Sequence, residues 1–353
     1  MAPEEVREAV DKAMKDWRKK LNENYPVIGT LAKPKTGVFL PAPRASGGGA
    51  APILHHARSF AAAPLASSPS AAPQGPGPLL LVSRKPRAYI QRNFLSPAEC
   101  KSLISMILQR QEGSHFEKKV RAPLEVDDSK WSKEQRDLIM SVEARLAELT
   151  GGPMHSEETA LVGTLTPPDR LLHEASVADH LGLHVDTNQA QWRFCTAIIY
   201  LSSLAEGLSG GETIFPVALP LSEGLPSEAE EQAMDSAGCL LDLGLEHTDK
   251  ALKVPALDMK LSPAQSVKAV EAANNLLQAA SPGGTGLRVK PEEGCVCIFW
   301  TRQDDGEVDR FSFHGGAPVV FSAGAESAGD ASSGWKWTLQ KFKEVPSETR
   351  HSP

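Results

Sequence analysis

The sequence has no uninterrupted apolar run as long as the roughly 18 residues that a membrane-spanning helix requires. It also has no excess of positive charge. Against 44 Asp and Glu stand 37 Lys and Arg, and the net charge of −7 argues against a general nucleic-acid-binding protein. The opening stretch, MAPEEVREAV, is acidic and contains no apolar segment, so no secretory signal is visible. These absences favour a cytoplasmic protein that neither spans a membrane nor binds nucleic acid.

Cysteine is scarce, and its spacing excludes the usual small frameworks. The five cysteines are Cys100, Cys195, Cys239, Cys295 and Cys297. Their number is odd and no two form a C-x-x-C pair, so neither a complete disulfide framework nor a cysteine-rich zinc site is favoured. Cys195 and Cys297 lie in apolar runs, where a free thiol behaves as a small apolar side chain. We therefore expect buried free thiols.

Composition divides the chain into four regions. Residues 1–32 carry apolar side chains at helical spacing and predict an amphipathic helix, which either packs on the main domain or binds a partner or a membrane surface. Residues 33–85 are rich in Pro, Ala, Gly and Ser and are typical of a disordered linker. The main domain is expected over residues 86–345, followed by a tail at 346–353.

The main domain opens with helices and strands. Alternation predicts a strand over 88–93, and Ser96 begins a Ser-Pro-Ala-Glu helix start with good capping residues. A polar loop is expected at about 113–130, and a second helix over 132–149 that ends at a Gly-Gly pair. Residues 160–165 read as a strand that leads towards the most informative part of the sequence.

That part is the stretch LGLHVDTNQAQWRFCTAIIYLSSLAEGLSGGETIFP, which contains His184 and Asp186. In a strand, residues two apart point to the same face, so both side chains can reach one metal ion. The dense apolar run at 192–201 predicts a buried strand, and His314 downstream offers a third ligand. Two histidines and a carboxylate that leave coordination positions open are typical of non-haem iron(II) oxygenases, whereas a structural zinc site is closed by protein ligands.

Six pieces in order carry a resemblance to a known family: HVD, RFCTAIIYL, GGETIFP, VKPEEGCVCIFW, DGEVDRFSFHGGAPV and GWKW. Together they resemble the catalytic domain of the prolyl 4-hydroxylases, which are Fe(II)- and 2-oxoglutarate-dependent dioxygenases. The resemblance covers about 86–345 with two long interruptions. Flanking helices followed by many short strands fit a mainly β (α+β) fold, a double-stranded β-helix or jelly-roll barrel.

The resemblance implies that His184, Asp186 and His314 bind Fe(II), and it assigns no catalytic residue beyond this metal centre. It implies that the chain hydroxylates prolyl residues of a peptide or protein while O2 and 2-oxoglutarate are consumed and succinate and CO2 are released. L-ascorbate would keep the iron reduced. Collagen-type hydroxylation is a secretory activity, so the endoplasmic reticulum is the alternative compartment.

For 2-oxoglutarate, the resemblance implies a lysine that pairs with the distal carboxylate, because a buried carboxylate without a partner is costly. Lys336 in GWKW has the right context, although it follows the last ligand histidine later than in the family. Lys341 and Lys343 are alternatives that we expect to be solvated. Thr196 is a further candidate for binding the cosubstrate. The family usually has a tyrosine that helps hold 2-oxoglutarate where this chain has Leu181.

Residues 217–284 are a longer insertion than this family is expected to carry. They contain a Ser/Glu-rich stretch, expected to be a loop, and a predicted helix over 262–280. We expect this insert to be an appendage outside the barrel.

Two other functions remain open. The same chemistry could act on a lysyl residue, a free amino acid or a small metabolite. Alternatively, the barrel could bind a peptide without catalysis.

Overall fold

The computed structural model describes residues 75–110, 120–169, 181–187, 193–219, 221, 225–254, 261–303, 307–322 and 334–345. The helix expected in 1–32, most of the linker and the tail at 346–353 lie outside these ranges. No helix within the described ranges is both long and apolar enough to cross a membrane.

The described elements are short strands with helices between them. The strands are β1 (Leu79–Ser83), β2 (Ala88–Gln91), β3 (Val120–Leu124), β4 (Leu161–Thr166), β5 (Pro168–Asp169), β6 (Arg193–Tyr200), β7 (Leu208–Gly210), β8 (Thr213–Phe215), β9 (Leu287–Val289), β10 (Val296–Trp300), β11 (Gly315–Gly316), β12 (Val319–Phe321) and β13 (Lys336–Glu344). The helices are α3 (Pro97–Gln109), α4 (Lys133–Thr150), α5 (Glu228–Asp242), α6 (Thr248–Leu252), α7 (Pro263–Ala279) and the 3-10 turn η3 (Arg310–Ser312).

Seven of these strands form one large sheet in the order β1-β2-β10-β6-β13-β4-β3. All its neighbouring strands run antiparallel. Two smaller sheets, β11-β8-β9 and β5-β12-β7, lie to one side of it. The sheet-rich fold with helices that the sequence predicted is confirmed.

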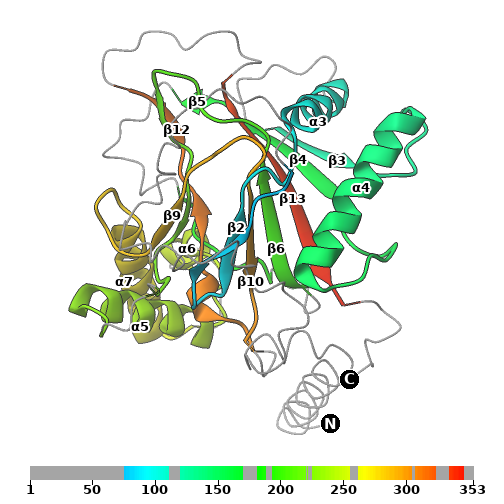
Figure 1. The fold of residues 1–353 in the computed structure, drawn as a ribbon. Coiled ribbons are helices and arrows are strands. Elements are labelled where there is room, and N and C mark those ends of the chain that lie inside the picture. The colour runs from blue at the N-terminus through cyan, green and yellow to red at the C-terminus, as the bar shows by residue number, and fades with distance from the viewer. Residues whose placement is uncertain are drawn as a thin grey trace, which may run out of the picture.

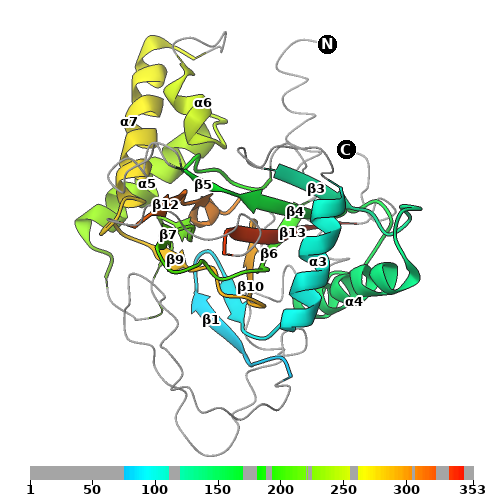
Figure 2. The same ribbon diagram turned by 90° about the horizontal axis from the view of Figure 1, so that it is seen from above.

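Helices α3 and α4 cover the opposite face of the large sheet (Figures 1 and 2). Both begin with a capping box, at Ser96 and at Ser132, in which the serine and the residue three positions later cap each other's backbone. Helix α4 ends at Gly151, whose left-handed backbone (φ 69°) favours glycine. Their apolar sides bury a core with Trp337 and Leu339 of β13. The two helices predicted here are confirmed.

A second core lies between the large sheet and the small sheet β11-β8-β9. Ile198 and Tyr200 from β6 pack there with Phe215 of β8, Val289 of β9 and Phe299 of β10. Because alternate residues of a strand face opposite sides, β6 supplies both cores: Cys195, Ala197 and Ile199 belong to the helix-side core. The functional residues described below sit at the edge of this second core.

Two expected boundaries are wrong. Leu79–Ser83, expected to belong to the linker, is strand β1 and pairs with β2, because its apolar run buries Leu79 and Val82. The polar loop expected at 113–130 contains strand β3, which pairs with β4. This short edge strand contains Pro123, and a proline within a run argues against a strand, which is why a loop was the expectation.

The insert is more structured than expected. Its Ser/Glu-rich stretch forms helix α5, which begins at a capping box between Ser227 and Glu230. The insert leaves after β8 and returns at β9, two paired strands in which Phe215 faces Leu287. Helices α5 to α7 lie beyond the small sheets (Figure 2) and share a core with Val185 and Phe313, next to the predicted ligands. The insert lies outside the large sheet, but it is not a separate appendage.

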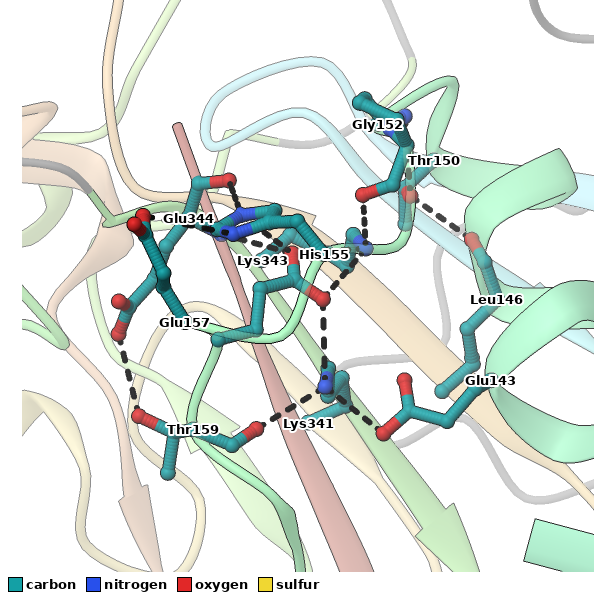
Figure 3. A network of polar contacts seen from close by, with 12 residues as sticks. Glu143, Leu146, Thr150, Gly152, His155, Glu157, Thr159, Lys341, Lys343 and Glu344 are labelled. Atoms are coloured by element: carbon teal, nitrogen blue, oxygen red, sulfur yellow. Dashed lines mark hydrogen bonds and ion pairs between the residues drawn. The ribbon is translucent and has the colours of Figure 1, made fainter. Parts of the chain in front are cut away.

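Lys341 and Lys343 are not solvated, contrary to expectation. They lie on the helix-facing side of β13, with exposures of 3% and 0%. Both belong to a buried ion-pair network with Glu143 of α4 and with Glu158, and Figure 3 shows the two lysines beside Glu143. The Lys341 amine donates to Glu143 (2.7 Å), and Glu158 pairs with both lysines at 3.2 and 2.7 Å. Burial lowers the pKa of Lys343, opposed by Glu158, and raises the pKa of Glu143, opposed by Lys341.

Candidate metal centre

Two distant segments meet at the predicted ligands. The backbone N–H of His184 donates to the carbonyl of His314 (2.8 Å), and the N–H of His314 donates back to the carbonyl of His184 (2.9 Å). This reciprocal pair is the hydrogen-bonded arrangement of antiparallel strands. Backbone pairing therefore fixes the separation of the two histidines, while the side chain of Asp186, two residues after His184, turns to the same site.

The three side chains converge on one point. Their ligand atoms all lie within 4.8 Å of one another, which makes His184, Asp186 and His314 the candidate metal-binding group among the described residues. Nε2 of His184 is 3.3 Å from one carboxylate oxygen of Asp186, and Nε2 of His314 is 3.3 Å from the other. Metal–ligand bonds of about 2.0–2.2 Å at right angles place donors about 3 Å apart, so these separations fit one ion.

The other nitrogen of each ring is already engaged. Nδ1 of His184 lies 2.9 Å from the carbonyl oxygen of Gly182, and Nδ1 of His314 lies 3.0 Å from that of Ser312. We assign the proton to Nδ1 in both rings, because a carbonyl can only accept. The lone pairs on both Nε2 atoms then point at a carboxylate, an arrangement that a shared cation stabilises.

The side chain of Thr196 holds Asp186 in place. The Thr196 hydroxyl donates to a carboxylate oxygen of Asp186 at 2.8 Å, inside the core. Burial alone would raise the pKa of Asp186. When His314 and His184 also carry a proton on Nε2, their charge and hydrogen bonds outweigh burial and hold that pKa well below its usual range; a metal cation would take the place of those protons. Thr196 thus orients a predicted metal ligand, and its direct contact with 2-oxoglutarate stays a prediction.

Lys336 lies on the side of β13 opposite to the buried lysine network and is buried, with an exposure of 7%. Its side chain lies against two glycines. A Cβ at Gly211 would meet the Lys336 stem at 3.4 Å, and a Cβ at Gly316, two residues after His314, would lie 3.5 Å from the amine. The lysine therefore extends towards the strand that follows the last predicted ligand.

Tyr200, which lies near the predicted metal centre on the same strand as Thr196, is not among the site residues that the sequence predicts. It is fully buried in the core between the sheets, and its hydroxyl donates to the Thr213 hydroxyl at 2.8 Å. The signal was available, because Tyr200 has the same strand parity as Thr196 and so faces the same side. Leu181, in contrast, packs in the core shared with the insert helices.

The donor set defines a two-histidine, one-carboxylate metal centre of the kind used by non-haem iron(II) oxygenases. No protein-family model matches the chain. Curated relatives do: it is 25% identical to prolyl 4-hydroxylase 2 of Arabidopsis thaliana over 289 residues, covering 80% of this chain and 75% of the relative. It is 26% identical to probable prolyl 4-hydroxylase 3 of the same plant, covering 75% and 71%. The predicted resemblance to prolyl 4-hydroxylases is confirmed.

Solved structures give weaker similarities. A viral collagen prolyl hydroxylase from Paramecium bursaria Chlorella virus-1, solved with 2-oxoglutarate, is 15% identical, with a TM-score of 0.38 over 73% of this chain and 96% of that one. A prolyl-4-hydroxylase from Pseudomonas putida is 11% identical, with a TM-score of 0.34 over 73% and 93%. Because these scores are low, the metal centre and the sequence relatives carry the functional conclusion.

Proposed function

We propose that this chain is an Fe(II)- and 2-oxoglutarate-dependent dioxygenase that hydroxylates prolyl residues of a peptide or protein. One atom of O2 enters a substrate C–H bond as hydroxyl, and the other enters succinate as 2-oxoglutarate loses CO2. The observation that carries the proposal is the convergence of both Nε2 atoms and the Asp186 carboxylate on one point, in a chain related to prolyl 4-hydroxylases over most of its length.

Each residue of the centre has a task. The triad would hold Fe(II) on one side and leave the remaining positions for 2-oxoglutarate and O2. When bound, the iron supplies the oxidising chemistry, and L-ascorbate restores its reduced state. The chain contributes orientation: two Nδ1–H groups anchored on carbonyls and a carboxylate anchored on the Thr196 hydroxyl.

We further propose that the facing sheets form a double-stranded β-helix. The support is the buried core between them, which contains side chains from β6 and β10 on one side and from β8 and β9 on the other. The metal ligands lie at one edge of this core, where His314 contacts Phe215 and Phe299. Cosubstrate bound beside them would be shielded from water, which strengthens charge-assisted contacts.

The buried Lys336 is proposed to pair with the distal carboxylate of 2-oxoglutarate. Its orientation towards Gly316 and its location outside the Lys341 network support this role. Replacement of Lys336 by Ala is expected to raise the KM for 2-oxoglutarate about ten- to a hundredfold, and Lys336→Arg should recover part of the loss. Lys290→Ala, on the surface, is the control. An unchanged KM for Lys336→Ala would remove this lysine from the cosubstrate site.

The function itself is tested by turnover. Full-length protein, Fe(II), ascorbate, 2-oxoglutarate and a panel of proline-rich peptides should give succinate and peptides that have gained one oxygen. Lysine-containing peptides and free proline belong in the panel, because the substrate class is part of the proposal. His184→Ala should lose both iron binding and turnover. Full activity in that variant, or no 2-oxoglutarate-dependent succinate with any peptide, would contradict the proposal.

A further inference from the structure

The insert adds a third segment to the backbone pairing at the metal centre. The N–H of Val185 donates to the carbonyl of Glu246 (3.1 Å), and the N–H of Thr248 donates to the carbonyl of Leu183 (2.9 Å). These bonds flank His184 on the side opposite to its pairing with the segment of His314. The segment that carries the first predicted ligand is therefore held between one strand of the sheet core and one piece of the insert.

This register places His247 directly beside His184. The two residues form an antiparallel bridge without bonds between their own backbone groups, the arrangement in which facing side chains come closest. Their rings stack, with centroids 5.4 Å apart and planes 6° from parallel. A shift by one residue would turn His247 to the other face, so the pairing of the insert fixes the stack.

The two ligand histidines differ in what surrounds them. His314 is 4% exposed, and its ring contacts the rings of Phe215 and Phe299, with centroids at 5.6 and 4.6 Å. His184 is 31% exposed, so surrounding core cannot hold its ring to the same degree. One edge is set by the Gly182 carbonyl, and one face is covered by His247. The insert thus supplies His184 with a neighbouring ring, as the core supplies His314 with Phe215 and Phe299.

We propose that His247 is a positioning residue for the metal centre. Its stacked ring fixes the plane of His184, and with it the direction of the Nε2 lone pair. The packing of α5 and α7 against Leu183 and Val185 holds it in register. This inference rests on the proposed function only in that the triad binds a metal ion.

The test measures metal binding by the metal-free full-length protein, without cosubstrate or turnover. Mn(II) affinity and the visible absorption spectrum of the Co(II) form are compared in wild type, His247→Ala, His247→Leu and His247→Phe. Val267→Ala, on the exposed side of α7 at 67% exposure, is the control, and His184→Ala marks the loss of the site. Leucine fills space without a flat ring, whereas phenylalanine keeps the ring.

We expect His247→Ala and His247→Leu to bind Mn(II) about two- to tenfold more weakly, with an altered Co(II) spectrum, and His247→Phe to resemble wild type. If the alanine variant does not fold, the leucine and phenylalanine variants decide alone. Equal affinities and spectra for leucine and phenylalanine would overturn the positioning role. Wild type that binds no better than His184→Ala would overturn the metal centre itself, and the proposed function with it.

Discussion

Thr196 supports a predicted metal ligand with a single hydrogen bond to Asp186. Replacing it by valine keeps the shape but removes the hydroxyl, and loss of such a supporting contact typically costs about ten- to a hundredfold in metal affinity. We expect that loss in a Mn(II) titration of Thr196→Val. Thr164→Val is the matched control, because the Thr164 hydroxyl is buried without a hydrogen-bond partner in the structure. A Thr196→Val affinity equal to that of the control would show that Asp186 needs no such support.

Asp309 is a buried carboxyl whose effect on stability depends on pH. Burial raises the pKa of Asp309 to about 6. The hydrogen bond that its side chain accepts from the N–H of Phe311 (3.0 Å) and the charges of Lys85 and Arg87 oppose this rise. The folded state therefore binds this proton more tightly than the unfolded state, in which the carboxyl has its ordinary pKa of 3.8. Asp309 therefore contributes about 3 kcal/mol to the free energy of unfolding below about pH 4, and this contribution is lost as the pH rises through about 6.

Asp309→Asn isolates this effect, since the amide oxygen can still accept from Phe311 but carries no charge. Between about pH 4 and 7, the unfolding free energy of wild type should fall relative to that of the variant, as measured by urea denaturation across the range. Two pH profiles that stay parallel would mean that the carboxyl is solvated in solution.

At the scale of elements, the buried lysines tie β13 to α4 and to the segment that follows it. Glu158 is the shared partner, so Glu158→Gln leaves Lys341 and Lys343 buried with less compensating charge. We expect about 3–5 kcal/mol lower stability in denaturant unfolding, with iron affinity per folded molecule unchanged. Lys133→Ala, which breaks an exposed pair with Asp137, should have no measurable effect. Equal stability of both variants would show that water reaches the network.

The elements that sequence patterns predicted are those with local signals. Helices α3 and α4 have serine caps and apolar periodicity, and β6 is a dense apolar run. Helix α5 had the same kind of cap at Ser227, but its acidic, Ser-rich composition favoured a loop. The burial of Lys341 could not be predicted, because its partner Glu143 lies far away in sequence and a charge pattern alone indicates a solvated face.

The candidate site follows the same division. His184 and Asp186 are two apart, and the motif around His314 was informative, so the triad was predicted and its members converge. His247 belongs to a short segment without periodicity. Its position depends on backbone pairing between chain segments distant in sequence, which no local pattern encodes.

At the scale of the whole molecule, the reactivity of the cysteine thiols depends on the folded state. All five cysteines are free, as expected; four are buried and Cys239 is partly exposed. Burial raises the pKa of Cys100 and of Cys295 to about 12, which suppresses their reactive thiolate. Native protein should therefore react quickly with a thiol reagent at Cys239 alone, and Cys239→Ser should abolish that fast phase. Full labelling should require denaturant. A second fast thiol in native protein would contradict the packed cores.

The place of β13 in the sheet has a consequence for how the molecule is made. It is the last described strand along the chain, yet it lies between β6 and β4 in the large sheet (Figure 1). During synthesis on the ribosome, every other described strand emerges before β13. Until β13 is made, β6 and β4 are unpaired edges of two separate groups of strands, β1-β2-β10-β6 and β4-β3. Such edges invite pairing with other chains. Messages truncated before Lys336 should therefore yield aggregates for the quality-control machinery, not soluble proteins that merely lack activity.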